Sequence, residues 1–176
     1  MPTNVEIKAR ARDPVALAAR ARILSDALPE TLHQRDTFFG CAHGRLKLRE
    51  LASGESELIW YDRPDVAWSR RSDYRVTSIA DPAALRDLLG RAHGVTQVVE
   101  KTRTLCVVGQ TRIHLDEVVG LGSFVELEVV LQDGQAESEG HRIAAELMVS
   151  LGIATTDLLT SAYAEMLPSG ACRADG

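Results

Sequence analysis

Charged and apolar residues alternate with period two in several segments, which is the pattern of strands that bury one face. The alternation predicts strands at residues 6–10, 45–49, 99–105, 112–116 and 124–129, and further candidates at 58–63 and 74–79. Charge on an exposed strand face is common, so any one of these strands could simply face solvent.

Helices are predicted between these strands. Asp13–Pro14 and Asp81–Pro82 each place a capping acid before a proline at the first helical position, and the second helix is expected to stop at Gly90. Apolar residues at helical spacing predict further helices over 137–151 and 156–167. Strands joined by short turns, with helices inserted in groups, favour an antiparallel α+β fold, specifically a closed or nearly closed barrel.

The chain has 176 residues without a repeat or a linker. This predicts one domain at 1–168 and a small, polar, flexible tail at 169–176. No apolar run approaches the roughly 20 residues needed to cross a bilayer, so no membrane partner is expected. The charged N-terminus is unlike a signal peptide, and three widely spaced cysteines suit reduced thiols, so the expected location is cytoplasmic.

The net charge of -5 is unevenly distributed. Residues 1–75 carry 13 Lys and Arg against 11 Asp and Glu, whereas residues 76–176 carry 7 against 14. This balance disfavours long nucleic acid as a partner and leaves room for a local anion site.

The charges on the predicted strands also separate by sign. Two strands are basic and one is acidic, with side chains Arg45, Lys47, Arg49, Lys101, Arg103, Glu126 and Glu128. If the strands curl into one barrel, these charges meet inside it and require a ligand or mutual pairing. A triphosphate with a divalent metal uses both signs, because Lys and Arg bind phosphate oxygens while carboxylates bind Mg²⁺ or Mn²⁺.

An ordered set of motifs runs through residues 4–167. It comprises N-V-E-I-K at 4–8, D-T-F-F at 36–39, a basic strand at 44–50, a strand ending in R-P-D at 58–65, K-T-R at 101–103, the block 112–128 with L-D, G-L-G and E-L-E, and the segment 157–163. This set resembles the CYTH superfamily of triphosphate tunnel metalloenzymes, which includes class IV adenylyl cyclases and thiamine triphosphatases. The resemblance is greatest to the cyclase-like branch.

The resemblance implies an eight-stranded antiparallel barrel that encloses a triphosphate and Mg²⁺ or Mn²⁺. The metal ligands it implies are Glu6, Glu126, Glu128 and Asp116. The catalytic residues it implies are Lys8, Lys101 and Asp116, and the substrate-binding residues are Lys47, Arg49, Arg63, Arg103 and Arg112. Arg63 depends on the register of its strand, since a shift by one residue would place Asp62 inside instead.

The reaction that the resemblance favours is class IV-type adenylyl cyclase, an ATP-binding lyase that forms cyclic AMP and pyrophosphate. The alternative is hydrolysis of tripolyphosphate, thiamine triphosphate or a nucleoside triphosphate. A further alternative is a non-catalytic or diverged protein that binds a phosphorylated ligand. The oligomeric state stays open, with a homodimer as one option.

The sequence departs from the family pattern at two positions. Asn4 replaces the first glutamate of the E-x-E-x-K signature, which removes one negative charge from the expected metal site. Cys106 stands where relatives often have an aromatic hydroxyl residue, and we expect it to be a small buried side chain.

His114 shares a face with Arg112 and Asp116, where a hydrogen-bonded structural histidine is favoured over a proton shuttle. Core packing is likewise the favoured role of the phenylalanines at 38–39.

Overall fold

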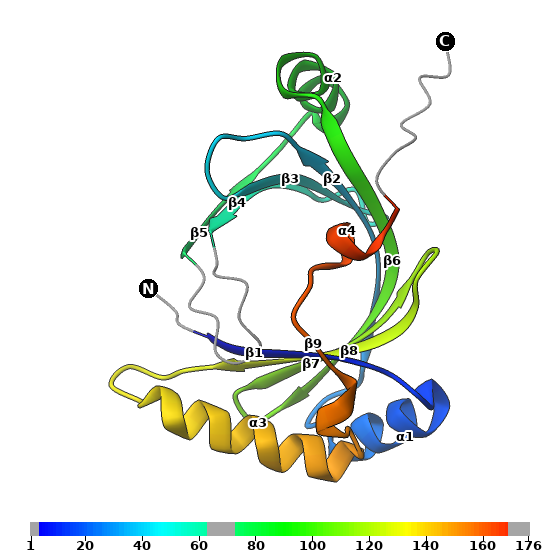
Figure 1. Ribbon diagram of the computed structural model, residues 1–176, viewed down its shortest axis with the longest axis vertical. Coiled ribbons are helices and arrows are strands. Elements are labelled where there is room, and N and C mark those ends of the chain that lie inside the picture. Colours follow the sequence, from blue (N-terminus) through cyan, green and yellow to red (C-terminus); the bar gives the residue numbers. More distant parts are fainter. Residues whose placement is uncertain (1–3, 63–72, 169–176) are drawn as a thin grey trace.

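A single antiparallel sheet forms the centre of the protein and curls round so that one of its faces is concave (Figure 1). The computed structural model describes residues 4–62 and 73–168. The strand order across the sheet is β5-β4-β3-β2-β6-β7-β8-β1-β9. The strands are β1 (Asn4–Arg10), β2 (Glu30–Phe39), β3 (Arg45–Leu51), β4 (Ser56–Asp62), β5 (Asp73–Ser78), β6 (Val95–Val108), β7 (Thr111–Val118), β8 (Gly122–Val130) and β9 (Leu158–Leu159).

The predicted antiparallel α+β fold is confirmed, and the sheet differs from the predicted barrel in two details. It has nine strands among the described residues, where eight were expected. It ends at β5 and β9, so within this part of the chain it is curled without being closed. The additional strand is β9, which pairs with Lys8 and Ala9 of β1.

The helices are α1 (Pro14–Leu24), α2 (Pro82–His93), α3 (Glu137–Leu151) and α4 (Tyr163–Met166). Asp13 and Asp81 cap the first two, each accepting a hydrogen bond from a backbone N–H three residues on. The prediction that α2 stops at Gly90 is wrong. The helix continues to His93 and ends at Gly94, whose positive φ of 74° favours glycine and whose N–H donates to the Gly90 carbonyl. No helix among the described residues has the length and apolar character needed to cross a membrane.

The predicted helix over 156–167 is also wrong. This segment begins in a 3₁₀ turn, Thr155–Asp157, continues as β9 and ends in the single turn of α4. Pairing of Leu158 and Leu159 with β1 holds the chain extended and carries Tyr163 over the concave face, where its side chain is buried. Tertiary pairing therefore overrides the helical spacing of the apolar residues.

The main core lies between the convex face of β1, β7 and β8 and the helices α1 and α3 (Figure 1). It is formed by aliphatic side chains, among them Val5, Ile7, Ile113, Val125, Leu127, Leu17, Met148 and Leu151. Because these strands turn their apolar residues outward to the helices, their polar residues point to the concave face.

The β7–β8 hairpin fixes which side chains face each other inside. Its turn uses Gly120 and Gly122 at φ of 79° and 92°, a backbone region where other residues are strained. The resulting register places His114 opposite Glu126 and Asp116 opposite Phe124.

Candidate functional site

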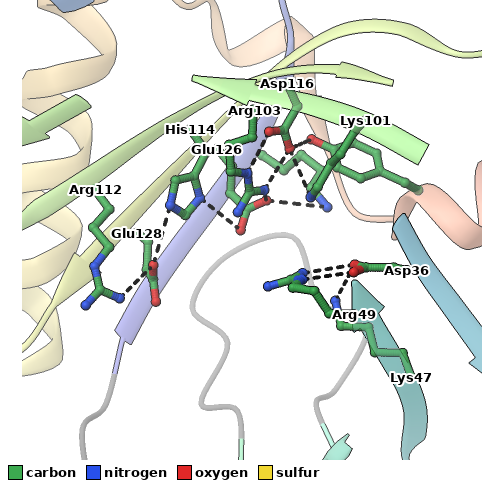
Figure 2. A network of polar contacts seen from close by, with 12 residues as sticks. Asp36, Lys47, Arg49, Lys101, Arg103, Arg112, His114, Asp116, Glu126 and Glu128 are labelled. Carbon is green, nitrogen blue, oxygen red and sulfur yellow. Dashed lines mark hydrogen bonds and ion pairs between the residues drawn. The ribbon is translucent and has the colours of Figure 1, made fainter. Parts of the chain in front are cut away.

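Polar side chains of both signs gather on the concave face, and they come from six strands (Figure 2). They are Asn4, Glu6 and Lys8 of β1, Asp36 of β2, Lys47 and Arg49 of β3, Lys101 and Arg103 of β6, Arg112, His114 and Asp116 of β7, and Glu126 and Glu128 of β8. Antiparallel partners share a face, so the strand registers alone place these residues together.

Asp116 is at the centre of the first group. Arg103 donates from Nε to Asp116 Oδ1 and from Nη2 to Oδ2, both at 2.7 Å. Lys101 Nζ lies 3.4 Å from Oδ2, and the Tyr163 hydroxyl donates to the same oxygen at 3.0 Å. Burial opposes ionisation of Asp116, yet the paired cations hold its pKa below the ordinary value. Asp116 is therefore a buried carboxylate with both oxygens engaged.

Asp36 organises a second group on the neighbouring strands. Arg49 donates from Nε to Asp36 Oδ1 and from Nη2 to Oδ2, both at 2.9 Å. Lys47 Nζ donates to Oδ2 at 2.8 Å. Although burial disfavours the charge of Asp36, Lys47 and Arg49 hold its pKa far below the ordinary value. Figure 2 shows this group, with Lys47 and Arg49 both directed to Asp36, as a cluster separate from the Asp116 group.

Glu126 lies between cations from two strands, β1 and β6. Its Oε2 is 3.9 Å from Lys8 Nζ and 3.4 Å from Arg103 Nη2. Burial opposes its ionisation, but the charge of Lys8 is the largest of the influences that hold the pKa of Glu126 well below its ordinary value. His114 Nδ1, buried and without a hydrogen-bond partner, lies 3.9 Å from Glu126 Oε1.

Glu128 occupies the outer part of the same row. It accepts a very short hydrogen bond from Asn4 Nδ2, and its Oε2 is 3.4 Å from Arg112 Nη1. His114 Nε2 lies 3.9 Å from Oε2. Glu6 stands opposite Glu128 in the register and so shares this part of the concave face.

The two buried lysines have altered basicity. Burial first, and then the charge of Arg103, lowers the pKa of Lys101 from 10.5 to about 7. Burial and the charge of Arg49 lower the pKa of Lys47 from 10.5 to about 8. Lys101 therefore loses its proton near neutral pH and Lys47 at slightly alkaline pH, and a bound anion would favour the charged form of both.

The oxygen atoms on the concave face include candidate ligands for a divalent metal. Among residues 4–62 and 73–168, no three Asp, Glu, His or Cys side chains converge on a point that a metal could occupy. Asn4 Oδ1, however, is a buried oxygen without a hydrogen-bond partner, next to the carboxylate of Glu128. Amide and carboxylate oxygens suit Mg²⁺ and Mn²⁺, which keep further positions for phosphate or water. The donor set fits a cation that arrives with phosphate oxygens.

Most residues predicted for the site lie together on the concave face. Arg63 lies outside the described residues. Of the two residues before it, Tyr61 pairs with Arg45 and faces the concave side, whereas Asp62 lies on the opposite, exposed face. Sequence reasoning missed Asp36 and Tyr163 as members of the site. Asp36 was recognised only as part of a motif, and its partners become visible only when the β2–β3 register is known.

The sequence also singled out Cys106, the phenylalanines at 38–39 and His114. Cys106 is buried in the main core, as predicted. Phe38 and Phe39 are buried, and Phe38 packs in a second apolar cluster with Phe124 and Tyr163, which confirms the packing role. His114 shares the face of Arg112 and Asp116, but its Nδ1 lacks the hydrogen bond expected of a structural histidine.

Most of the chain matches the model of one protein family. The model of the CYTH domain matches residues 2–163. Among curated proteins, no sequence matches this chain.

Solved structures with the same fold are numerous, and three illustrate their range. The PH1012 protein of Pyrococcus horikoshii OT3 is 21% identical with a TM-score of 0.83, over 94% of this chain and 99% of that one. A candidate adenylate cyclase of Vibrio parahaemolyticus is 21% identical with a TM-score of 0.77, over 93% and 97%. HpAC1 of Hippeastrum, an adenylyl cyclase candidate with a dominant triphosphatase activity, is 15% identical with a TM-score of 0.66, over 94% and 93%. At these identities the likeness is one of fold.

Proposed function

This chain belongs to the CYTH family, and from that premise we propose that it is a metal-dependent enzyme that cleaves a triphosphate bound on the concave face of its sheet. The observation that carries the proposal is the cluster of basic side chains from several strands on that one face. Lys8, Lys101 and Arg103 are all buried there, and Lys47 and Arg49 lie beside them. Two of the carboxylates on this face, those of Asp36 and Asp116, are each shared by two of these cations, so a bound anion would add counter-charge where burial makes positive charge costly.

The roles follow from position. Lys47, Arg49, Arg103 and Arg112 would hold phosphate oxygens, with Arg63 as a further candidate from the sequence. Lys8 and Lys101 would stabilise the negative charge that develops on the phosphoryl group during displacement. Asp116, engaged by Arg103 and Lys101, would act by orienting these cations.

The metal would be held by Glu6, Glu126 and Glu128, with Asn4 Oδ1 as an added oxygen ligand. When bound, Mg²⁺ or Mn²⁺ supplies charge neutralisation and polarisation at phosphorus. Asn4, which donates to Glu128, orients that carboxylate within the site.

The reaction that we propose is adenylyl cyclisation, in which the ribose 3′-hydroxyl attacks the α-phosphorus and pyrophosphate leaves. A nucleotide needs an apolar surface beside the phosphate-binding cations. The rings of Tyr61 and Phe38 lie on the concave face, with their centroids 5.7 and 5.6 Å from Lys47 Nζ. Since Phe38 is buried, half-buried Tyr61 is the ring that we propose to contact the base. Hydrolysis of the terminal phosphate is the second candidate, because HpAC1 has the same fold and a dominant triphosphatase activity.

Product analysis tests the proposal. The protein is incubated with ATP, tripolyphosphate or thiamine triphosphate and Mg²⁺ or Mn²⁺, and the products are separated by chromatography. Cyclic AMP with pyrophosphate supports the cyclase, and orthophosphate supports the hydrolase. Turnover should be lost in Glu126→Gln, which removes a metal ligand, and retained in Asp87→Asn, whose carboxylate is in an exposed ion pair. Absence of product from every substrate would contradict both reactions.

A further inference from the structure

Two groups on the concave face have the same atomic arrangement. In each, an arginine donates from Nε and Nη2 to the two oxygens of an aspartate, at 2.9 Å for Arg49 with Asp36 and at 2.7 Å for Arg103 with Asp116. In each, the lysine two residues before the arginine approaches Oδ2 of the same aspartate, at 2.8 Å in one case and 3.4 Å in the other.

The strand registers explain the match. Asp36 pairs directly with Arg49 across β2 and β3, and Asp116 pairs directly with Arg103 across β6 and β7. The chain order is reversed between the two groups, since Asp36 precedes its Lys-x-Arg and Asp116 follows it. The arrangement is therefore set by geometry across neighbouring strands, and a search for a sequence repeat would miss it.

Such pairing fixes an arginine in a useful orientation. The guanidinium is planar and has five N–H donors, so a carboxylate bound through Nε and Nη2 leaves Nη1 to point elsewhere. Arg49 and Arg103 are held in this way from adjacent pairs of strands, β3-β2 and β6-β7. Each aspartate thus fixes the direction of one arginine and one lysine before a ligand binds, which lowers the ordering cost of binding.

We propose that Asp36 is a positioning residue equivalent to Asp116, and that the two aspartates hold two matched Lys-x-Arg pairs in the orientation that grips successive phosphoryl groups. The inference rests on the proposed function for the identity of the ligand. It assigns Asp36 to neither metal binding nor contact with substrate, because both of its oxygens are taken by Arg49 and Lys47.

The first test measures melting temperature without metal, with and without tripolyphosphate. Asp36→Asn leaves two buried cations without their counter-ion, so its ligand-free melting temperature should fall by about 10 °C. Tripolyphosphate should then raise the melting temperature of Asp36→Asn more than that of the unmodified protein, since the anion replaces the missing charge. Asp116→Asn should behave alike, and Asp87→Asn, from the exposed pair with Arg91, should match the unmodified protein.

The second test separates orientation from charge. Asp36→Glu keeps the charge but moves the carboxylate, so the melting temperature should stay within a few degrees while kcat falls by about 10- to 100-fold and KM changes little. A ligand-induced shift in Asp36→Asn no larger than in Asp87→Asn, or an unchanged kcat in Asp36→Glu, would overturn the proposal. If Asp36→Asn does not fold, the kcat of Asp36→Glu decides.

The two proposals fail differently. If the unmodified protein turns over no triphosphate but Asp36→Asn shows the larger shift with tripolyphosphate, the proposed enzymatic function falls and the positioning role stands. If the unmodified protein is active and Asp36→Glu is equally active, the positioning role falls and the function stands.

Discussion

Asn4 places an uncharged amide beside the carboxylates of Glu6 and Glu128 on the concave face. Its amide nitrogen donates to Glu128, and its amide oxygen is buried without a partner. A glutamate at this position would add a charge where the site is already acidic, and it would lose the donor that restrains Glu128. Asn4 therefore restrains the Glu128 carboxylate without adding a further negative charge beside it.

We predict that Asn4→Glu binds Mn²⁺ at least about tenfold more tightly, because one further carboxylate joins the ligand set. The same variant should be less stable without metal, since two like charges then meet. Calorimetric titration with Mn²⁺ and thermal melting measure the two effects, with Asn4→Gln as the neutral control. Equal Mn²⁺ affinity in Asn4→Glu and the unmodified protein would remove Asn4 from the metal site.

The lowered pKa values of Lys101 and Lys47, about 7 and about 8, predict a pH dependence of both stability and binding. An unfolded lysine titrates near 10.4. Between about pH 7 and 10 the unfolded chain therefore binds more protons than the folded one, and these two groups make the free energy of unfolding rise with pH in that window.

Binding should show the opposite pH dependence. An anion favours the protonated lysines, so tripolyphosphate binding at pH 8 should take up protons and weaken as the pH rises further. The uptake is measured by calorimetry in two buffers of different ionisation enthalpy, such as Tris and phosphate-free HEPES. Lys101→Met should show less uptake, and an identical binding enthalpy in both buffers for the unmodified protein would contradict the assignment.

At the scale of elements, the segment after α3 completes the site. Arg12 donates to Asp157 at 2.6 Å, β9 pairs with β1, and Arg45 forms an ion pair with Glu165. Figure 1 shows α4 on the concave side of the sheet, whereas α1, α2 and α3 lie outside it. This segment places Tyr163 beside the two buried lysines, with its ring centroid 4.0 Å from Lys8 Nζ and 5.2 Å from Lys101 Nζ.

We predict that Tyr163→Phe lowers the free energy of unfolding by about 1.5–3 kcal/mol, because it loses a buried hydrogen bond to the charged Asp116. Tyr163→Leu should cost more, since it also loses the cation–π contacts with both lysines. Urea unfolding measures both variants. Equal stability of Tyr163→Phe and the unmodified protein would show that the hydroxyl contributes nothing to this contact.

Elements with a clean pattern were predictable from the sequence, and those defined by pairing were not. The helix over 137–151 and the strands with alternating charge appear as expected, because local spacing alone determines which face they bury. The sequence of β2 does not alternate cleanly, because residues 36–39 are buried on both faces. The segment 156–167 was predicted as a helix because its leucines have helical spacing, but Leu158 and Leu159 pair with β1 as a strand.

The same limit applied to the candidate site. Glu126, Glu128, Lys101 and Arg103 could be chosen from period two on single strands. Asp36 could not be assigned a role, because its role depends on which residue of β3 stands opposite it, and register is not encoded in either strand alone.

For the whole molecule, the acidic net charge of -5 masks a basic interior. The concave face carries basic side chains from β1, β3, β6 and β7, and the convex face of β1, β7 and β8 is covered by α1 and α3. Fold, charge and family membership together support the proposal that this interior binds a compact anion. Neither the net charge nor any single strand predicts this arrangement.

The most direct test of this account is a calorimetric titration of the protein with tripolyphosphate in the presence of Mg²⁺ or Mn²⁺. We predict one saturable site, weakened by about 10- to 100-fold in Lys101→Met, because a charge-assisted contact in a buried site is lost. Arg91→Met, which removes a cation from an exposed ion pair with Asp87, should bind as the unmodified protein does. No saturable binding, or equal affinity in Lys101→Met and Arg91→Met, would contradict the central claim that the concave face binds a triphosphate.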